Sequence, residues 1–203
     1  PEMVALLETF AERCGRAGIT RLWEHGIPPE EYLASTRKFI DGSTRAHLAF
    51  ERPVTLTVPA SPKYHDGDKG ALTDGFTGWG DYHMHWLGFE GEDMVATIDL
   101  GRPATVSRIE TDFLQDILSW VFMPSSVEFA VSADGVAYRT VGVVQDSIPP
   151  DRGGPIVTPF NVQFGPTPAR FVRVKAISLK TCPAWHKGAG GKAWIFIDEI
   201  KVF

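Results

Sequence analysis

From Glu51 to the end of the chain, apolar residues alternate with polar ones, a period of two that is typical of half-buried β-strands. Clusters of Gly, Pro and Asp separate the alternating runs, as expected for turns. Two of these runs flank Ala133-Asp134-Gly135, which predicts a hairpin turn. The pattern predicts an antiparallel β-sandwich of about 150 residues. The runs are VTLTV, MVATIDL, TVSRIETDF, SVEFAVS, AYRTVGVV, NVQF, ARFVRVKA and WIFIDEIKVF.

Residues 1–48 have a different, helical spacing. PPEEYLASTRKFI predicts the start of a second helix there, because proline is favoured in a first turn. We interpret 1–48 as the tail of an upstream domain, for which a catalytic role is one option, and 49–203 as the sandwich. A helical hairpin that belongs to this chain alone is the alternative. Since the chain begins with Pro1, we expect it to be a piece of a longer protein. The apolar stripe of the first helix comprises Met3, Leu6, Leu7, Phe10 and Cys14.

Composition and charge exclude several classes of partner. With 43% apolar residues among 203, the chain can bury a substantial core. The net charge is -5 and no basic stripe follows the sequence, so we expect no nucleic-acid partner. No apolar run approaches the roughly 20 residues that span a bilayer, so we expect no membrane partner. Cys14 and Cys182 fit no zinc or redox spacing and are predicted to be buried free thiols.

Motifs that would indicate an enzyme are absent or incomplete. GAGGK is followed by a strand instead of the helix that a phosphate loop requires. His83 and His85 have the spacing of half a metal site, but the sequence offers no third ligand, so surface or sugar contacts are the better interpretation. The acidic residues 90–93 are predicted to lie on a solvated turn, and no nucleophile elbow occurs. We therefore predict that this chain is not itself an enzyme.

Five segments, in order along the chain, resemble a known family. The chain is similar to discoidin or coagulation factor 5/8 type C domains, also described as family-32-type carbohydrate-binding modules. FLQDILSW and WHKGAGGKAW look like the branch at the C-terminus of secreted bacterial β-N-acetylhexosaminidases, or chitobiases. The resemblance implies a galactose-binding-like jelly-roll sandwich with binding loops at one end, in a secreted, periplasmic or cell-surface protein. The five segments are ALTDG, WLGFEGEDMVATIDLG, SSVEFAVSADGVAY, ARFVRVKA and FIDEIKVF.

The glycine-rich segment 183–194 carries aromatic residues that strand packing does not explain, except for Trp194, which begins the last strand and is predicted to be buried. An indole on a loop can stack on a sugar ring while polar side chains bind its hydroxyls. We therefore expect glycans with a terminal hexose or N-acetylhexosamine as partners, with galactose, N-acetylgalactosamine and N-acetylglucosamine all open. Docking of the same aromatics onto an upstream domain of the parent chain is the alternative. The predicted sugar-binding residues are Trp185, His186, Lys192, Trp120, Tyr64 and His85.

The turn ALTDGFTGW predicts a structural cation, because carbonyl oxygens can converge there with an aspartate, and Ca²⁺ favours six to eight oxygen ligands. Trp79 departs from the family pattern, since relatives tend to have a hydroxyl there, so only its carbonyl could serve. On the last strand, the carbonyl of Asp198 and the carboxylate of Glu199 are the implied pair. The resemblance implies Ca²⁺ bound by Ala71, Asp74, Phe76, Trp79, Asp198 and Glu199.

The last strand contains a change of phase that supports this pair of ligands. Ile195 and Ile197 share one parity, whereas Ile200 and Val202 share the other. A β-bulge between the two pairs would let both face the core. In the alternative interpretation Glu199 is solvated, and one face of the strand carries Trp194, Phe196, Ile200 and Val202.

Overall fold

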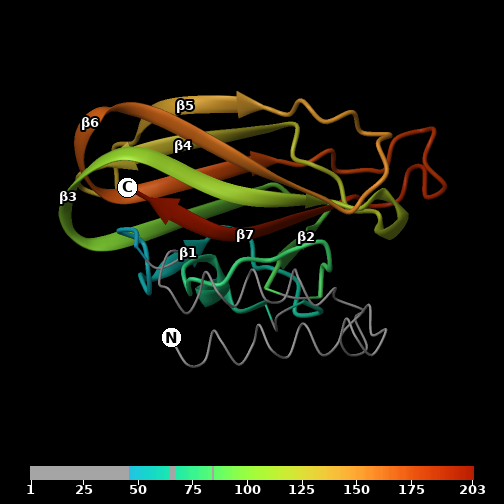
Figure 1. Cartoon of the computed structure of the whole chain (residues 1–203), viewed down its shortest axis with the longest axis horizontal. Coiled ribbons are helices and arrows are strands. Elements are labelled where there is room, and N and C mark those ends of the chain that lie inside the picture. Colours follow the sequence, from blue (N-terminus) through green and yellow to red (C-terminus); the bar gives the residue numbers. More distant parts are fainter. Residues whose placement is uncertain (1–45, 65–66, 84) are drawn as a thin grey trace, which may run out of the picture.

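A computed structural model of the chain describes residues 46–64, 67–83 and 85–203 (Figure 1). The predicted helices lie outside these residues, so the boundary at residue 48 stays a prediction. The only helices among the described residues are two short 3-10 helices, η2 (Lys69–Leu72) and η3 (Ile117–Ser119). No helix in these ranges is long and apolar enough to cross a membrane.

Seven antiparallel strands form the body of the described chain, in the order β2-β7-β3-β6-β4-β5, with β1 paired to β3. Two of the strands are 22 residues long and take part in both layers of the fold. The mainly β, jelly-roll fold predicted from the sequence is confirmed. The strands are β1 (Val54–Leu56), β2 (Leu87–Glu90), β3 (Met94–Gln115), β4 (Ser126–Ser132), β5 (Arg139–Gln145), β6 (Ile156–Ile177) and β7 (Trp194–Val202).

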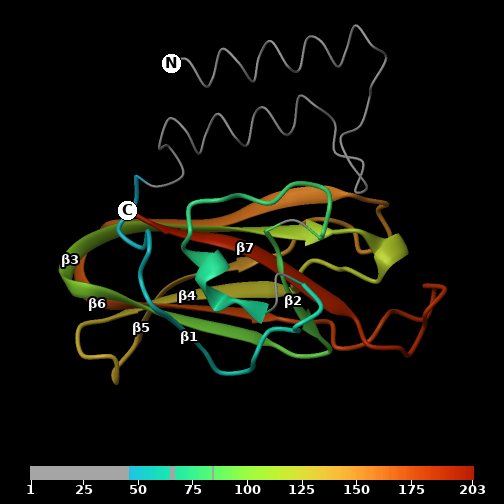
Figure 2. The ribbon, with the colours of Figure 1, turned by 90° about the horizontal axis from the view of Figure 1, so that it is seen from below.

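The two long strands turn the sheet into a sandwich because each bends near its middle. The pairing of β3 with β6 shifts register between Asp99 and Ala104, across Gly101 and Pro103. The first part of β3 pairs with β1 and the second part with β7, so the two halves belong to different layers. Figures 1 and 2 show both strands curving at the same end of the molecule. The alternation of apolar and polar residues instead predicts two separate runs for each of these bent strands.

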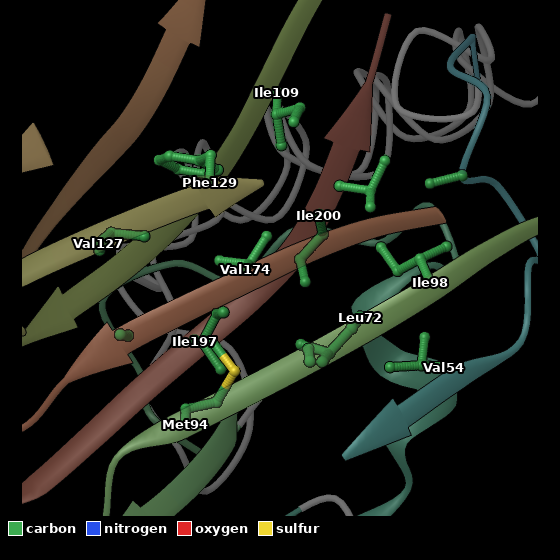
Figure 3. Close-up of a cluster of buried hydrophobic side chains, with 14 of the residues drawn as sticks. Val54, Leu72, Met94, Ile98, Ile109, Val127, Phe129, Val174, Ile197 and Ile200 are labelled. Carbon is green, nitrogen blue, oxygen red and sulfur yellow. The ribbon is translucent and has the colours of Figure 1, made fainter. Parts of the chain in front are cut away.

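The main core lies between the layers and follows the predicted alternation. In β3, Met94, Ala96 and Ile98 are buried while the residues between them are half-buried. Ile109 in the second half of β3 and Ile197 and Ile200 of β7 meet them from the facing layer (Figure 3). Burial of these side chains supplies the main driving force for folding, at about 25 cal/mol per Å² of apolar surface. The predicted hairpin is also confirmed, since β4 pairs with β5 across a turn in which Gly135 has a φ of 76°.

The predicted bulge in β7 is confirmed by its pairing with β3. Ile197 pairs with Phe113 and Ile200 with Thr111, so β7 advances three residues while β3 advances two. The extra residue lets Ile197 and Ile200 enter the same core despite their opposite parity (Figure 3). It also places Asp198 and Glu199, the two residues of the bulge, in the interior.

Several loops meet at one end of the sandwich because of how the strands pair. Met94 pairs with Ala176, and Gln115 pairs with Ile156, so both ends of β3 lie beside the ends of β6. Glu90 likewise lies opposite the start of β7. The loops that gather there, to the right in Figure 1, are 91–93, 116–125, 146–155 and 178–193. We refer to this end as the loop end.

Candidate functional site

The segment 178–193 at the loop end is folded back on itself by backbone hydrogen bonds. The N–H of Cys182 donates to the carbonyl of Gly191 at 2.8 Å, and the N–H of Gly190 donates to the carbonyl of Cys182 at 3.1 Å. Within the segment, the N–H of Ala189 donates to the carbonyl of His186 at 2.9 Å. Despite its glycines, this segment is a structured platform that can hold a side chain in place.

Two of its glycines are required by contact with Trp120. A Cβ added at Gly188 would lie 2.6 Å from the indole of Trp120, and one added at Gly191 would lie 2.8 Å from it. Trp120 itself follows η3 with a left-handed φ of 65°. The close approach that these two glycines allow is therefore to the protein's own indole.

His186 is also placed differently from the prediction. Its side chain is buried, with the residue only 7% exposed. Its Nε2 lies 2.7 Å from the carbonyl oxygen of Ile117, and its Nδ1 accepts a hydrogen bond from the N–H of Gly188 at 3.1 Å. Both ring nitrogens are therefore used inside the protein. The predicted contact of His186 with sugar is wrong, because the residue instead joins the 178–193 segment to η3.

Trp185 is the predicted residue that the structure leaves most available. It is 49% exposed, and one edge of its ring packs near Phe122, with centroids 6.3 Å apart. Lys192 of the same segment is exposed, and its aliphatic carbons lie over Gly91. Leu118, which was not among the predicted site residues, is 69% exposed on the neighbouring loop. The signal in the sequence that could have identified Leu118 is an apolar residue next to turn residues within FLQDILSW.

Tyr64 and Trp120 border a second apolar cluster, on the outer side of β2 and β7. The cluster encloses Trp194, which is 7% exposed, so its predicted burial is confirmed. Tyr64 packs edge-on against Trp194 with centroids 5.3 Å apart. Tyr82, which was not predicted, also lies at the edge of the cluster. Tyr64 and Trp120 are thus half-buried residues beside the loop end.

His85 lies in a separate place, next to the turn predicted to bind the cation. Its ring stacks on that of Phe76, with centroids 4.8 Å apart and planes 6° apart. The ring of Trp79 lies beside that of His85, with centroids 6.2 Å apart. The Trp79 carbonyl accepts a hydrogen bond from the indole N–H of Trp86 at 2.8 Å. The structure therefore does not group His85 with Trp185.

The turn 74–79 and the bulge of β7 face one another, as the sequence analysis expected. The N–H of Gly75 donates to Oε2 of Glu199 at 3.0 Å, and the N–H of Gly78 donates to Oδ2 of Asp198. The Asp198 carbonyl, the expected ligand, accepts a hydrogen bond from the Thr111 hydroxyl at 2.7 Å. The carboxylate of Asp198, which was not among the predicted ligands, also faces the turn.

Both bulge carboxyl groups are fully buried, and this burial determines their acidity. Burial raises the pKa of Glu199 to about 9, although its hydrogen bond from Gly75 acts in the opposite direction. Burial also raises the pKa of Asp198 well above its ordinary value. Nε2 of His47 lies 2.9 Å from Oε1 of Glu199, so these two groups are positioned to share a proton. The alternative interpretation, a solvated Glu199, is wrong.

The residues around the bulge are suited to a hard cation. Oδ1 of Asp198 is buried and has no hydrogen-bond partner in the part of the chain that the structure describes. Nearby, Asp74 contributes to the raised pKa of Glu199 and accepts a hydrogen bond from the N–H of Phe76 at 2.8 Å. Within the described ranges, no three His, Cys, Asp or Glu side chains form a metal cluster. A cation here would therefore take most of its ligands from carbonyl oxygens, which Ca²⁺ accepts.

The acidic turn before β3 has the ordinary, solvated character that the sequence predicted. Glu90 and Glu92 are exposed, and Asp93 forms an ion pair with Lys180 at 2.9 Å. These carboxylates do not form the facing pair that glycoside hydrolysis requires.

Comparison with known proteins agrees with this architecture. The family described as F5/8 type C domain matches residues 57–197. No curated protein sequence matches the chain. A chitosan-binding module from a chitosanase/glucanase of Paenibacillus sp. IK-5 is 18% identical, over 77% of this chain and 98% of that module, with a TM-score of 0.51.

Two further solved structures have similar coverage. The Clostridium perfringens module CpGH89CBM32-5, solved with GalNAc-β-1,3-galactose, is 18% identical over 75% of this chain and 95% of its own, with a TM-score of 0.47. A fucose-binding module of Streptococcus pneumoniae is 14% identical over 77% of this chain and 94% of its own, with a TM-score of 0.46. At these identities the likeness concerns the fold alone.

Proposed function

Because the chain belongs to the F5/8 type C domain family, we propose that it is a non-catalytic module that binds the terminal sugars of glycans through aromatic side chains at its loop end. The observation that carries this proposal is the position of Trp185, which is half exposed on a segment held by its own hydrogen bonds. A large exposed indole on a rigid support has little reason to be there unless it meets a partner.

A sugar ring is a suitable partner for such an indole. Its C–H face packs on the aromatic ring, while its hydroxyl groups need polar neighbours. Lys192 supplies an ammonium group from the same segment, and it makes no ion pair within the described residues. Because one face of a single sugar buries little area, we expect a weak dissociation constant, on the order of 0.1 to 1 mM.

The second possibility is that the loop end docks onto another domain of the parent protein. Leu118 favours this role, since an aliphatic side chain that is 69% exposed contributes to protein interfaces more readily than to sugar binding. The parent protein would then be a secreted glycoside hydrolase, such as a β-N-acetylhexosaminidase, with this module as a spacer packed against the catalytic domain.

We propose in addition that a structural Ca²⁺ lies between the turn 74–79 and the bulge of β7. Asp74, Asp198 and Glu199 would provide carboxylate oxygens, with carbonyl oxygens of the turn completing the set. The unpartnered Oδ1 of Asp198 supports this proposal. When bound, such an ion neutralises buried carboxylates and ties the last strand to the turn before β2.

A glycan-array screen of this chain tests the sugar-binding proposal. We expect binding to glycans that end in a hexose or N-acetylhexosamine, with loss of signal in Trp185→Ala. Uniform silence across the array would favour the docking role. A parallel assay with nitrophenyl N-acetylhexosaminides tests the absence of catalysis. Hydrolysis that a single Asp or Glu substitution in this chain abolishes would contradict it.

A further inference from the structure

A row of aromatic side chains, interrupted by the buried Trp194, extends the site away from Trp185. We call this row the aromatic band and define it as Trp185, Trp120, Trp194, Tyr64 and Tyr82. Trp185 and Trp120 both contact the ring of His186, at centroid distances of 5.7 and 6.1 Å. From there the band continues through the backbone hydrogen bond between Trp194 and Trp120, which is 2.9 Å long.

The second half of the aromatic band follows the outer side of β2 and β7, which are neighbouring strands in Figure 1. Tyr64 lies 5.3 Å from Trp194 and 5.9 Å from Tyr82, each measured between ring centroids. Tyr64 also covers Gly88, where an added Cβ would come within 3.0 Å of its ring. The band is therefore supported by the sheet along its length and is not confined to one loop.

The band differs from a hydrophobic core because the polar ends of its side chains, the phenol O–H and indole N–H groups, make no hydrogen bonds within the described residues. Within the described residues, the hydroxyls of Tyr64 and Tyr82 and the indole N–H groups of Trp120 and Trp185 make no hydrogen bond. Tyrosine and tryptophan normally find a partner for these groups when they are buried. Here the ring bodies pack while the donors remain accessible, in residues that are half-buried or exposed.

Charged groups border the band and add further hydrogen-bonding capacity. Nζ of Lys63 lies 5.7 Å from the centroid of Trp194. Glu90 is close enough to Tyr64 to contribute, after burial and Tyr82, to the raised pKa of that tyrosine. Neither Lys63 nor Glu90 forms an ion pair in the described part of the chain. Donors and an acceptor thus lie beside accessible aromatic surface, which is the combination that polyhydroxylated ligands require.

We infer that the aromatic band binds an unbranched chain of several sugars, with the Trp185 end holding one residue and the Tyr64–Tyr82 end holding residues further along the chain. This inference rests on the proposed function and deepens it, since a terminal sugar alone would contact only the Trp185 end. Additional contacts on a preformed surface should raise affinity with chain length until the band is covered.

Titration with glycans of increasing length tests the inference. The probes are β-1,4-linked oligomers of one to six residues, one series of N-acetylglucosamine and one of galactose, followed by isothermal titration calorimetry. In at least one series we expect the dissociation constant to fall at least about tenfold from one residue to four, or ~1.4 kcal/mol. Equal affinity at every length in both series would overturn the inference. Silence in both would overturn it as well, and binding of another single sugar, such as N-acetylgalactosamine, would then leave the proposed function intact.

A conservative double variant tests which residues provide the gain in affinity with glycan length. Tyr64→Phe with Tyr82→Phe removes both hydroxyls and keeps the ring packing, so the folded domain is preserved. We expect it to reduce the gain with length to less than about threefold, or ~0.7 kcal/mol, and to leave monosaccharide binding unchanged. Tyr138→Phe is the matched control, because Tyr138 lies beside the β4–β5 turn and contacts Arg173. If glycan affinity still increases with glycan length in the double variant, the glycan binds elsewhere on the module.

Discussion

Strand β7 joins two regions that use their polar groups in opposite ways. At its start, Trp194 is part of a row of aromatic residues whose N–H and O–H tips remain accessible. At its bulge, Asp198 and Glu199 are fully buried and face a turn that donates backbone N–H groups to them. The first arrangement suits a ligand that arrives from solvent, whereas the second suits a proton or ion that belongs to the fold.

This contrast implies that binding and stability can be altered separately. Substitutions at the bulge should change the free energy of unfolding and leave glycan affinity intact. Substitutions at exposed residues of the loop end should do the reverse. Only His186, which is buried but holds the segment that carries Trp185, should affect both properties.

The largest expected effect is the pH dependence of stability in the presence of a chelator. Below pH 4.5, the ordinary pKa, Glu199 is protonated in both folded and unfolded chains. Between 4.5 and about 9 the unfolded chain ionises while the folded chain keeps the proton, so stability falls as pH rises. We expect a decrease on the order of 5 kcal/mol across this window, measured by urea denaturation.

Glu199→Gln should reduce the slope of that profile, since it removes one of the two buried carboxyl groups with a raised pKa and leaves Asp198. Glu128→Gln, on the partly exposed surface of β4, should leave the profile unchanged and serves as the control. If the wild-type chain without divalent cations is equally stable at pH 5 and pH 8, ionisation of Glu199 does not dominate the pH dependence of its stability.

Chelation at constant pH should have the next largest effect. A ligand that binds only the folded state adds about 2.7 kcal/mol when present at 100 times its dissociation constant. We therefore expect EDTA to lower the melting temperature at pH 7 and Ca²⁺ to restore it. Asp74→Ala should remove this sensitivity, while Glu92→Ala, on an exposed turn, should retain it. Identical melting of the wild type in Ca²⁺ and in EDTA would argue against the cation.

Replacement of His186 should lower both the stability of the fold and the affinity for glycan. His186→Ala removes two hydrogen bonds, each worth about 1 kcal/mol, and leaves the carbonyl of Ile117 with only the N–H of Trp120 as its partner. We expect a loss of about 2 kcal/mol in stability together with most of the glycan affinity, because Trp185 loses its support. Val136→Ala, an exposed residue in the β4–β5 turn, is the control. Full binding by His186→Ala would show that the segment holds its shape without this residue.

Trp185→Ala should have the smallest effect on stability and a specific effect on binding. Since the residue is half exposed, we expect the free energy of unfolding to change by less than about 0.5 kcal/mol. The dissociation constant for a bound glycan should rise at least about tenfold, or ~1.4 kcal/mol, as measured by calorimetry or amide chemical shifts. Val136→Ala, an exposed apolar residue in the β4–β5 turn, is the control. Unfolding of Trp185→Ala would contradict the assignment of this residue to binding.

Much of the fold was predictable because alternation and turn residues are local signals. The sandwich, the β4–β5 hairpin, the burial of Trp194 and the bulge between Ile197 and Ile200 all follow from the order of apolar and polar residues. The phase change in the last strand was informative because a one-residue slip reverses which face each side chain occupies. The two bent strands were each predicted as two runs, since a proline-containing bend has the same local signature as a turn.

The candidate site was predictable only in part. Trp185 was correctly expected on an exposed loop, but His186 is buried and Gly188 and Gly191 pack on Trp120. A glycine that allows a ligand to approach and a glycine that allows an indole to approach are identical in sequence. The partner is decided by a segment about seventy residues away, which no local pattern specifies.

By itself, the sequence determined where the chain alternates, where it turns and where the last strand changes phase, because each depends on neighbouring residues and the two-residue period of a strand. Only the tertiary structure decided what the polar groups meet. It placed the carboxylate of Asp198 against the turn and the carbonyl of Asp198 against the Thr111 hydroxyl, and it left the tips of the aromatic band without internal partners. Burial and hydrogen bonding join residues distant in the chain, so they are properties of the packed molecule.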